Sequence, residues 1–438
     1  MSDDNRMDRR QVLGRGAALA GLAALSTEAL FAAEASAGYK ATTAYKGTLR
    51  VVGLGVDLIP AIQKAYEKTH PGIKLRFTVK DTPGIGQIVL TQPKTQDIMS
   101  GYYHQLDQVW PSGNLIPIPV EKVTAFGSIS RLIKQGALKP GVSPGQGDAP
   151  FRKIFLDSSK KKFATGASNW LTMIPGNHNS DSFGYNEKDV GGKLDSWAAL
   201  FDSHFKGRVA LISDPDIGFI DAGMAAKAAG KMTMKDLGDP TKKEIDDLTT
   251  ILKDLKKAGH FKAFWSTFEE SVQFMQSGAV VVESMWSPAV TLLQEANFPV
   301  RYAAPKEGFR GWGGGNAILT HVTGDKLAAA YDYLNWWNTP VPAGIMATQG
   351  YYNANISAAH KGLTSNPALG GVSADNYWLK GKAATKALVG PDGKPGIKPG
   401  ATRDGGSYEQ RSARFYAWNS QGQNRDYLLQ KWQEFITA

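Results

Sequence analysis

Hydrophobic residues between positions 196 and 226 change their spacing, which predicts a helix, a strand and a second helix in succession. Apolar residues within 197–201 are spaced as on one face of a helix. The apolar run 209–212 is bounded by turn residues, as in a buried parallel strand. Ligands of open α/β sheets lie at the carboxyl ends of strands. Asp214 and Asp216, which follow this strand directly, are therefore candidate binding residues.

The same alternation of strand and helix patterns continues along most of the chain. A β-α-β-α order favours a largely parallel sheet with right-handed crossovers, so the pattern predicts an α/β fold. The expected strands are 48–53, 73–79, 97–100, 209–212 and 279–283, and the expected helices are 59–68, 102–110, 241–258, 266–277, 327–337 and 424–436.

The chain has 438 residues, which is more than a domain with a single hydrophobic core usually contains. The length therefore predicts two lobes. We expect a first lobe over 38–182 and a second lobe over 183–312. The chain then returns to the first lobe and forms the hinge over 313–355. C-terminal helices follow over 356–438, interrupted by a loop rich in Gly, Pro and Lys at 391–406.

The N-terminal residues 1–37 have the composition of an export signal. Arg9 and Arg10 precede a small-residue apolar run at 16–33, and an Ala-Ser-Ala cleavage motif follows at 35–37. The paired arginines resemble the twin-arginine type of signal. The chain has no cysteine, which excludes a disulfide or a cysteine-linked lipid anchor. These features predict a periplasmic protein.

The charge and motif content narrow the class of function. The net charge is +10, but the lysines are scattered and are not interleaved with aromatic residues as on a nucleic-acid-binding face. The sequence contains no G-x-S-x-G, H-E-x-x-H or Walker-type motif. We therefore expect no nucleic-acid partner, no metal and no cofactor, and an enzyme on the same fold is kept only as an alternative.

Several motifs, taken in order, resemble those of family 1 extracellular solute-binding proteins, and in particular of the spermidine/putrescine type that serves ABC importers. The resemblance implies a two-lobed periplasmic-binding-protein type II fold with a ligand cleft between hinge-linked lobes. It also implies a monomer that delivers a small solute to an inner-membrane ABC permease. The matching motifs lie at 97–109, 196–215, 278–290, 311–319 and 349–360.

The resemblance assigns a set of residues to the cleft. It implies that Asp214 pairs with a ligand amine and that Trp286 and Trp312 wall the cleft. Aromatic faces attract cations, and a buried carboxylate requires a cationic or hydrogen-bonding partner. Asp214 has the alternative role of a helix N-cap, and Trp286 that of a core residue. The predicted ligand-binding residues are Ser100, Tyr102, Ser182, Asp214, Asp216, Trp286, Trp312, Asn316 and Tyr351.

The chain departs from the polyamine-binding pattern at three positions. Gly55 and Leu58 occupy positions where polyamine binders carry aromatic residues, and Gly314 replaces a second carboxylate. A ligand with two distant ammonium groups would leave one charge unpaired, which costs several kcal/mol. We therefore expect a small amine, or another cationic or zwitterionic solute. The glycines at 313–315 indicate either a phosphate cradle or a close approach of two backbones.

A ferric-iron-binding protein of the same fold is the first alternative, ahead of an enzyme. Adjacent tyrosine pairs occur at 102–103 and 351–352, and such phenolates bind ferric ion in related proteins. His104 and His178 are possible additional ligands without a characteristic spacing.

Overall fold

The computed structural model describes residues 43–164, 166–391 and 393–438. The predicted export signal, including its paired arginines, lies outside the described residues. Within the described part of the chain, every helix is too short or too polar to span a lipid bilayer.

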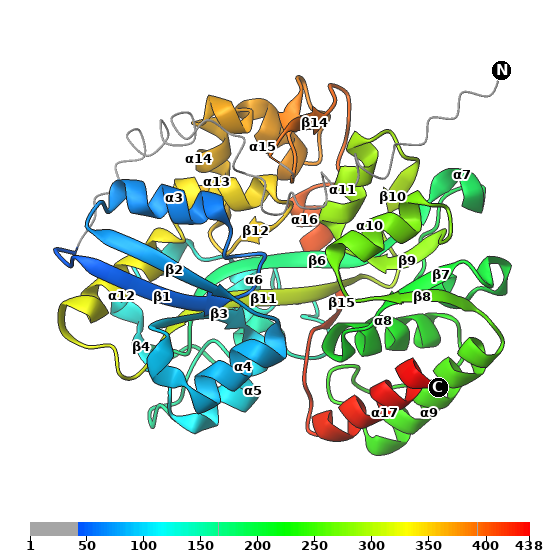
Figure 1. The fold of residues 1–438 in the computed structure, drawn as a ribbon, viewed down its shortest axis with the longest axis horizontal. Coiled ribbons are helices and arrows are strands. Elements are labelled where there is room, and N and C mark those ends of the chain that lie inside the picture. Colours follow the sequence, from blue (N-terminus) through cyan, green and yellow to red (C-terminus); the bar gives the residue numbers. More distant parts are fainter. Residues whose placement is uncertain (1–42, 165, 392) are drawn as a thin grey trace.

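One eleven-stranded mixed sheet extends through both halves of the molecule (Figure 1). Its main path has the order β2-β1-β3-β11-β6-β9-β7-β8. The pairings of β1 and of β7 are parallel, as the alternation of strands and helices predicts. These strands are β1 (Gly47–Gly53), β2 (Ile73–Val79), β3 (Ile98–Tyr102), β6 (Ile174–Asn186), β7 (Val209–Ile212), β8 (Phe261–Trp265), β9 (Val282–Met285) and β11 (Phe309–Ile318).

The long strands β6 and β11 connect the two halves. β6 pairs antiparallel with β11 along its first part and with β9 along its second part. β11 pairs with β3 of the first half at its carboxyl end. A third connection is β15 (Phe415–Trp418), which lies parallel to β11. The molecule is therefore two-lobed, and these strands join the lobes. The remaining strands of this sheet are β10 (Val300–Tyr302) and β12 (Tyr352–Asn353).

The glycine run of β11 serves close backbone packing. A Cβ added at Gly315 would lie 2.6 Å from the carbonyl oxygen of Ile174 on β6. A Cβ at Gly314 would lie 3.0 Å from the carbonyl oxygen of Gly101 on β3. Only glycine permits this approach of three strands without displacing a neighbour. Of the two interpretations of this run, the structure supports close approach.

Lobe 1 is built on β1, β2 and β3. Its core also includes residues from the C-terminal part of the chain, such as Tyr352, Trp378 and Ile397. The first helix buries Ala61, Ile62, Ala65 and Tyr66 on one face, and confirms the helix predicted over 59–68. The longer helices of this lobe are α3 (Pro60–Thr69), α4 (Thr82–Thr91), α12 (Gly324–Trp336), α13 (Pro340–Thr348), α14 (Ile356–Thr364) and α15 (Val372–Trp378).

Lobe 2 is built on β7, β8 and β9 and has its own core. Its longest helix starts at a capping box in which Thr241 and Glu244 exchange hydrogen bonds. The last helix of the chain packs here through Leu428, Trp432 and Phe435, next to the C-terminus marked in Figure 1. The helices of lobe 2 are α8 (Pro215–Ala228), α9 (Lys242–Lys257), α10 (Phe268–Gln276), α11 (Ser287–Glu295) and α17 (Arg425–Thr437).

Several predicted elements differ in the structure. The helix predicted over 197–201 is a 3-10 helix. The helix predicted over 102–110 is broken into short turns around α5, and Pro111 prevents its extension. The loop at 391–406 contains half of a small hairpin, β13–β14. The shorter elements are β4 (Ile118–Pro119), β5 (Trp170–Leu171), β13 (Leu388–Val389), β14 (Pro395–Ile397), α5 (Leu106–Val109), α6 (Arg131–Gln135), α7 (Glu187–Val190) and α16 (Tyr408–Ser412).

Candidate functional site

The middle of β6 forms a polar, buried floor between the lobes. Side chains alternate along a strand, so Asn177, Asn179 and Asp181 share one face. All three are buried. Asp181 accepts hydrogen bonds from Asn179 Nδ2 at 3.1 Å and from Trp312 Nε1 at 2.9 Å. Arg310 on β11 forms an ion pair with the same carboxylate at 3.4 Å. The floor is therefore a connected network and not a set of isolated polar groups.

Three of the predicted aromatic residues meet over this floor. Trp312 packs edge-to-face against Tyr102 at 5.4 Å and against Tyr351 at 5.5 Å between ring centroids. Trp312 and Tyr351 are buried, whereas Tyr102 is partly exposed. The hydrogen bond from Trp312 to Asp181 fixes the indole ring. The structure thus brings three residues from three segments of lobe 1 into one aromatic wall, which can stack on a ligand or attract a cation.

Asp57 is a site residue that the sequence analysis did not identify. It lies in the loop after β1, is buried, and accepts hydrogen bonds from Ser100 Oγ and Asn177 Nδ2, both at 2.9 Å. Burial raises the pKa of Asp57, and the two hydrogen bonds oppose that rise. Its position at the carboxyl end of a strand was a usable signal. The sequence comparison considered only Gly55 and Leu58 of that loop.

Asp214 combines an N-cap with a site position in lobe 2. Its Oδ1 accepts hydrogen bonds from the backbone N–H groups of Asp216 and Ile217 at 2.9 and 3.2 Å. Burial, followed by repulsion from Asp216, raises the pKa of Asp214 to about 6. Asp214 forms no ion pair with a Lys or Arg of the described residues, and its side chain is partly exposed. It is therefore available to a cationic ligand.

Asp216 has a different environment. Its Oδ2 forms an ion pair with Arg425 at 3.3 Å and accepts a hydrogen bond from Gln421 at 3.4 Å. The side chain is buried. These contacts tie the start of α8 to the segment that leads into α17. The structure therefore gives Asp216 a supporting contact within lobe 2.

The charges of carboxylates from both lobes act on the hydroxyl group of Tyr102. Burial raises the pKa of Tyr102 well above its ordinary value, and the charges of Asp57, Asp181 and Asp214 raise it further. The ring of His104 stacks on that of Tyr102 with 5.0 Å between centroids, and burial lowers the pKa of His104 to about 4. The histidine is therefore neutral at pH 7. The space beside Tyr102 has a negative potential that would favour a positively charged group.

The other predicted residues occupy different places. Trp286 is the N-cap residue of α11, is partly exposed, and packs edge-to-face on Trp265 at 5.0 Å. The next residue, Ser287, accepts a hydrogen bond from Asn179 at 3.3 Å, which sets the start of α11 against the floor.

Asn316 faces Ser100 across the β11–β3 pairing and is buried. Its Oδ1 has no hydrogen-bond partner among the described residues, so it can accept one from a ligand. Ser182 does not join the group. Strand alternation turns its side chain to the face of β6 opposite Asp181, and its backbone N–H donates to the Tyr302 hydroxyl at 2.6 Å.

The geometry gives little support to a ferric-iron site. Tyr352 packs against Tyr408 and His178, at 4.8 and 5.7 Å, away from Tyr351. Burial raises the pKa of Tyr103 and of Tyr351, which disfavours the phenolate form that ferric ion requires. Among the described residues, no three His, Asp or Glu side chains are grouped to hold a metal ion.

The model of one protein family, described as bacterial extracellular solute-binding protein, matches residues 61–371, most of the chain. The chain belongs to this family. The match confirms the resemblance that the motifs indicated. The family consists of extracellular solute-binding proteins. No curated protein sequence matches it at a significant level.

Solved structures are similar to this solute-binding protein over most of its length. A putative spermidine/putrescine ABC transporter from Listeria monocytogenes has a TM-score of 0.59 and 16% identity, with 89% of this chain and 98% of that chain covered. The Tp0655 (TpPotD) lipoprotein of Treponema pallidum has a TM-score of 0.61 and 11% identity, covering 89% and 99%. The Atu4243-GABA receptor has a TM-score of 0.55 and 18% identity, covering 89% and 97%. These similarities confirm the two-lobed type II fold.

Proposed function

We propose that this solute-binding protein captures a small amine, cationic or zwitterionic, between its lobes and delivers it to an inner-membrane ABC permease. One observation carries the proposal: the charges of carboxylates from both lobes act on the hydroxyl group of Tyr102 in the aromatic wall. Asp57 belongs to lobe 1, Asp214 to lobe 2 and Asp181 to the strand between them. An ammonium group fits this environment because it gains both ion-pair and cation–π interactions.

Asp214 is the proposed partner of the ligand ammonium group. Its carboxylate is partly exposed and has one oxygen, Oδ2, without a hydrogen-bond donor among the described residues. An ammonium group beside it would stabilise the ionised form and lower its raised pKa. The face of Trp286, at the start of α11, would complete the lobe 2 side of the site.

Asp57 changes the charge balance that the sequence indicated. The doubt about ligands with two ammonium groups depended on a missing second carboxylate, and Asp57 provides one in lobe 1. Its two hydrogen bonds come from neutral groups, so its charge is not balanced by a nearby cation. A diamine could therefore place one ammonium group beside each carboxylate, and an amino acid could place its amine beside Asp214.

The proposed mechanism is hinge closure. β6 and β11 join the lobes, and groups from both lobes contact the same space, so a ligand there stabilises the closed state by its differential affinity. The names of the similar structures include a spermidine/putrescine transporter and a GABA receptor, which supports an amine ligand. The signal at residues 1–37 supports periplasmic location and twin-arginine export. We propose a monomer that binds without chemical turnover.

Calorimetric titration of the mature protein, residues 38–438, tests the ligand class. The panel consists of putrescine, spermidine, γ-aminobutyrate and a neutral sugar. We expect an amine to bind and the sugar not to bind. In Asp214→Asn the affinity for that amine should fall roughly 30-fold, about 2 kcal/mol, because a charge-assisted hydrogen bond is lost.

Asp202→Asn is the matched control. Asp202 also caps a short helix of lobe 2 through its carboxylate, but it is exposed and outside the cleft. This variant should bind like the wild type. Equal amine affinity in Asp214→Asn and the wild type, or tight binding of the sugar, would contradict the proposed site. Recovery of a chemically altered amine would instead support the enzyme alternative.

A further inference from the structure

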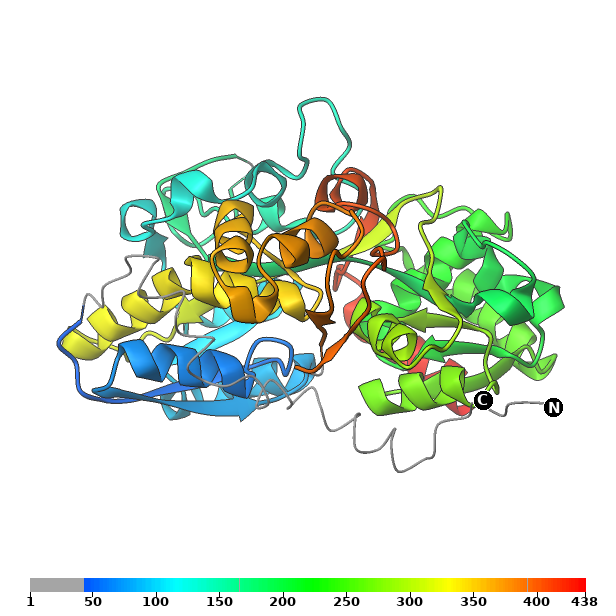
Figure 2. The same cartoon turned by 90° about the horizontal axis from the view of Figure 1, so that it is seen from above.

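The loop predicted at 391–406 forms a strap between the lobes. Its hairpin contributes Leu388 and Ile397 to the core of lobe 1. On its other side it packs against α11 of lobe 2, where the Glu295 side chain lies against glycines of the hairpin. Figure 2 shows this orange segment running from the helices of lobe 1 to the green helices of lobe 2. The strap thus connects the lobes outside the hinge strands.

Arg403 anchors the strap in lobe 1. Its guanidinium group is buried and donates hydrogen bonds to the carbonyl oxygens of Gly350 at 2.5 Å and Trp378 at 3.1 Å. The group also lies over the rings of Tyr352 and Trp378, at 4.9 and 5.2 Å. Its partners among the described residues are carbonyl oxygens and rings, so the arginine fixes backbone positions in lobe 1 and does not neutralise a carboxylate.

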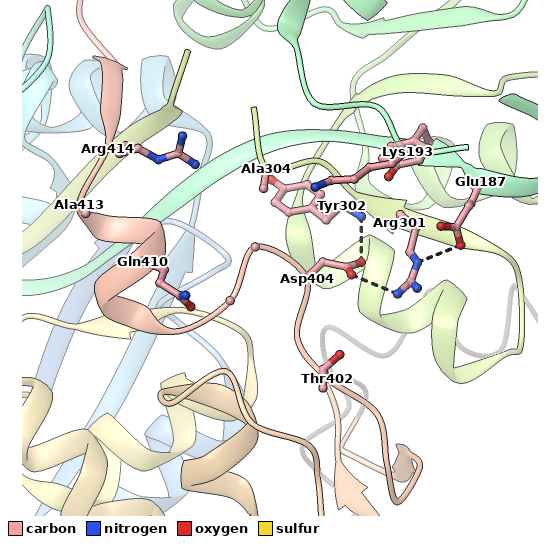
Figure 3. A pocket seen from close by; sticks show the side chains of 13 residues that line it. Glu187, Lys193, Arg301, Tyr302, Ala304, Thr402, Asp404, Gln410, Ala413 and Arg414 are labelled. Carbon is pink, nitrogen blue, oxygen red and sulfur yellow. Dashed lines mark hydrogen bonds and ion pairs between the residues drawn. The ribbon is translucent and has the colours of Figure 1, made fainter. Parts of the chain in front are cut away.

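Asp404, the next residue, is bound to lobe 2. Its Oδ2 accepts hydrogen bonds from Gln294 Nε2 at 2.8 Å and from the backbone N–H of Tyr302 at 3.0 Å. Its Oδ1 pairs with Arg301 at 3.2 Å, and Arg301 also pairs with Glu187 at 3.0 Å. Figure 3 shows Asp404 reaching from its loop to Arg301 and Tyr302. Two adjacent residues thus bind opposite lobes.

Arg411 holds the backbone of this junction. It is buried and donates to the carbonyl oxygens of Asp404 at 2.9 Å and Ser180 at 2.6 Å. Ser180 lies on β6, the strand that crosses between the lobes. The position of Asp404 is therefore fixed relative to the hinge as well as to lobe 2.

Arg403 and Asp404 each bind an element that carries a wall of the proposed cleft. Gly350, bound by Arg403, immediately precedes Tyr351 of the aromatic wall. A Cβ at Gly350 would lie 3.8 Å from Pro288 at the start of α11, so this backbone lies close to lobe 2. Gln294, bound by Asp404, is at the far end of the same helix, which begins after Trp286. The pair 403–404 therefore connects the elements that carry Tyr351 and Trp286.

A groove of about 740 Å³ runs beside this junction, between the strap and the edge of lobe 2. Asp404 crosses the gap, as Figure 3 shows. Its side chain is 17% exposed, against 44% for Arg301. Salt should therefore screen the ion pair more than the hydrogen bonds to Gln294 and Tyr302.

We propose that Arg403 and Asp404 are positioning residues that set the balance between the open and closed lobes, and through it the affinity for solute. The inference rests on the proposed function. Asp404 holds the lobes at the separation seen here. Arg403, through its hydrogen bond to Gly350, fixes the backbone next to Tyr351. Loss of the Asp404 contacts would let α11 move away from the aromatic wall, so the ligand-free protein would open further.

Pulsed electron paramagnetic resonance measures the distance between the lobes directly. The chain has no cysteine, so spin labels at Lys94→Cys in lobe 1 and Lys257→Cys in lobe 2 are unique, and both sites are exposed. In ligand-free Asp404→Ala we expect a longer and broader distance distribution than in the wild type. Asp404→Asn, which keeps a hydrogen-bond acceptor, should fall between the two, and it serves as the test if the alanine variant does not fold.

Glu409→Ala is the matched control, because Glu409 is an exposed acid of the same segment and forms no hydrogen bond or ion pair with the described residues of lobe 2. It should reproduce the wild-type distances. Distances in Asp404→Ala and Asp404→Asn that equal those of the wild type would overturn the inference. Because no ligand is present, this outcome is independent of whether the proposed amine site is correct.

Putrescine, used as a probe in stopped-flow binding, gives the functional measurement. We expect Asp404→Ala to release it several-fold faster while the association rate changes little, since the variant destabilises the closed state. If the label distances change but the release rate does not, the strap does not control affinity and the inference is wrong. If no panel amine binds the wild type, the proposed function fails, and the distance measurement still decides the role of Asp404 in lobe separation.

Discussion

Asp214 uses its two carboxylate oxygens for different purposes. Oδ1 caps α8, whereas Oδ2 has no donor among the described residues. The two roles that the sequence left open are therefore compatible. Asp57 shows the limit of sequence reasoning at this scale. The aspartate was visible, but its hydrogen bonds to Ser100 and Asn177 join segments far apart in the chain. Nothing in the local pattern indicates such contacts.

The raised pKa of Asp214, about 6, makes amine binding depend on pH. An ammonium ligand requires the ionised carboxylate, so protonation competes with binding below that pKa. The affinity should fall about tenfold between pH 7 and pH 5. Calorimetric titration at both pH values checks this, and Asp214→Asn should abolish most of the dependence. An affinity that is unchanged or higher at pH 5 would contradict the role of Asp214.

Glu283 on β9 is a buried carboxyl group in the core of lobe 2, and burial raises its pKa well above the ordinary value of 4.5. The unfolded chain loses this proton near pH 4.5, whereas the folded protein keeps it. The contribution of Glu283 to stability is therefore full at low pH and is lost as the pH rises. Urea unfolding should show the stability of Glu283→Gln rising relative to that of the wild type between pH 5 and pH 8, because the wild type loses this contribution as the pH rises. Equal pH dependence of stability in Glu283→Gln and in the wild type would contradict this prediction.

At the scale of elements, the periodic patterns predicted most of the regular structure. Two predicted helices, over 59–68 and 241–258, correspond to α3 and α9. Each of them buries one continuous apolar face. The helix predicted over 102–110 does not form, because its residues lie in different environments. Tyr102 is partly exposed, whereas Tyr103 and Leu106 are core residues. Such tertiary demands break a helix that spacing alone favours.

The close packing of β11 on β6 gives a prediction for this strand pair. In Gly315→Ala the new Cβ would lie 2.6 Å from the backbone carbonyl oxygen of Ile174, which cannot move without shifting β6. We expect a loss of about 1–3 kcal/mol in the free energy of unfolding, typical of overpacking. Gly176→Ala on β6 is the control, because its Cβ would make only ordinary contacts at 3.6 Å or more. Equal stability of both variants in urea would contradict this packing.

At the scale of the whole molecule, the sequence motifs predicted two lobes and a cleft between them, and the family match and similar structures confirm that architecture. The strap could not be predicted, because its Gly- and Pro-rich composition indicates a loop and does not indicate what the loop binds. Arg403 and Asp404 acquire their role only from the fold, which places Gly350 and Gln294 on either side of them.

Native mass spectrometry of the mature protein, purified without added ligand, tests the central claim most directly. The account predicts that the wild type retains one small solute bearing an ammonium group, and that Asp214→Asn loses it while Asp202→Asn keeps it. Retention of a metal ion or of a solute without an amine would contradict the account. An amine held equally by the wild type and Asp214→Asn would do so as well.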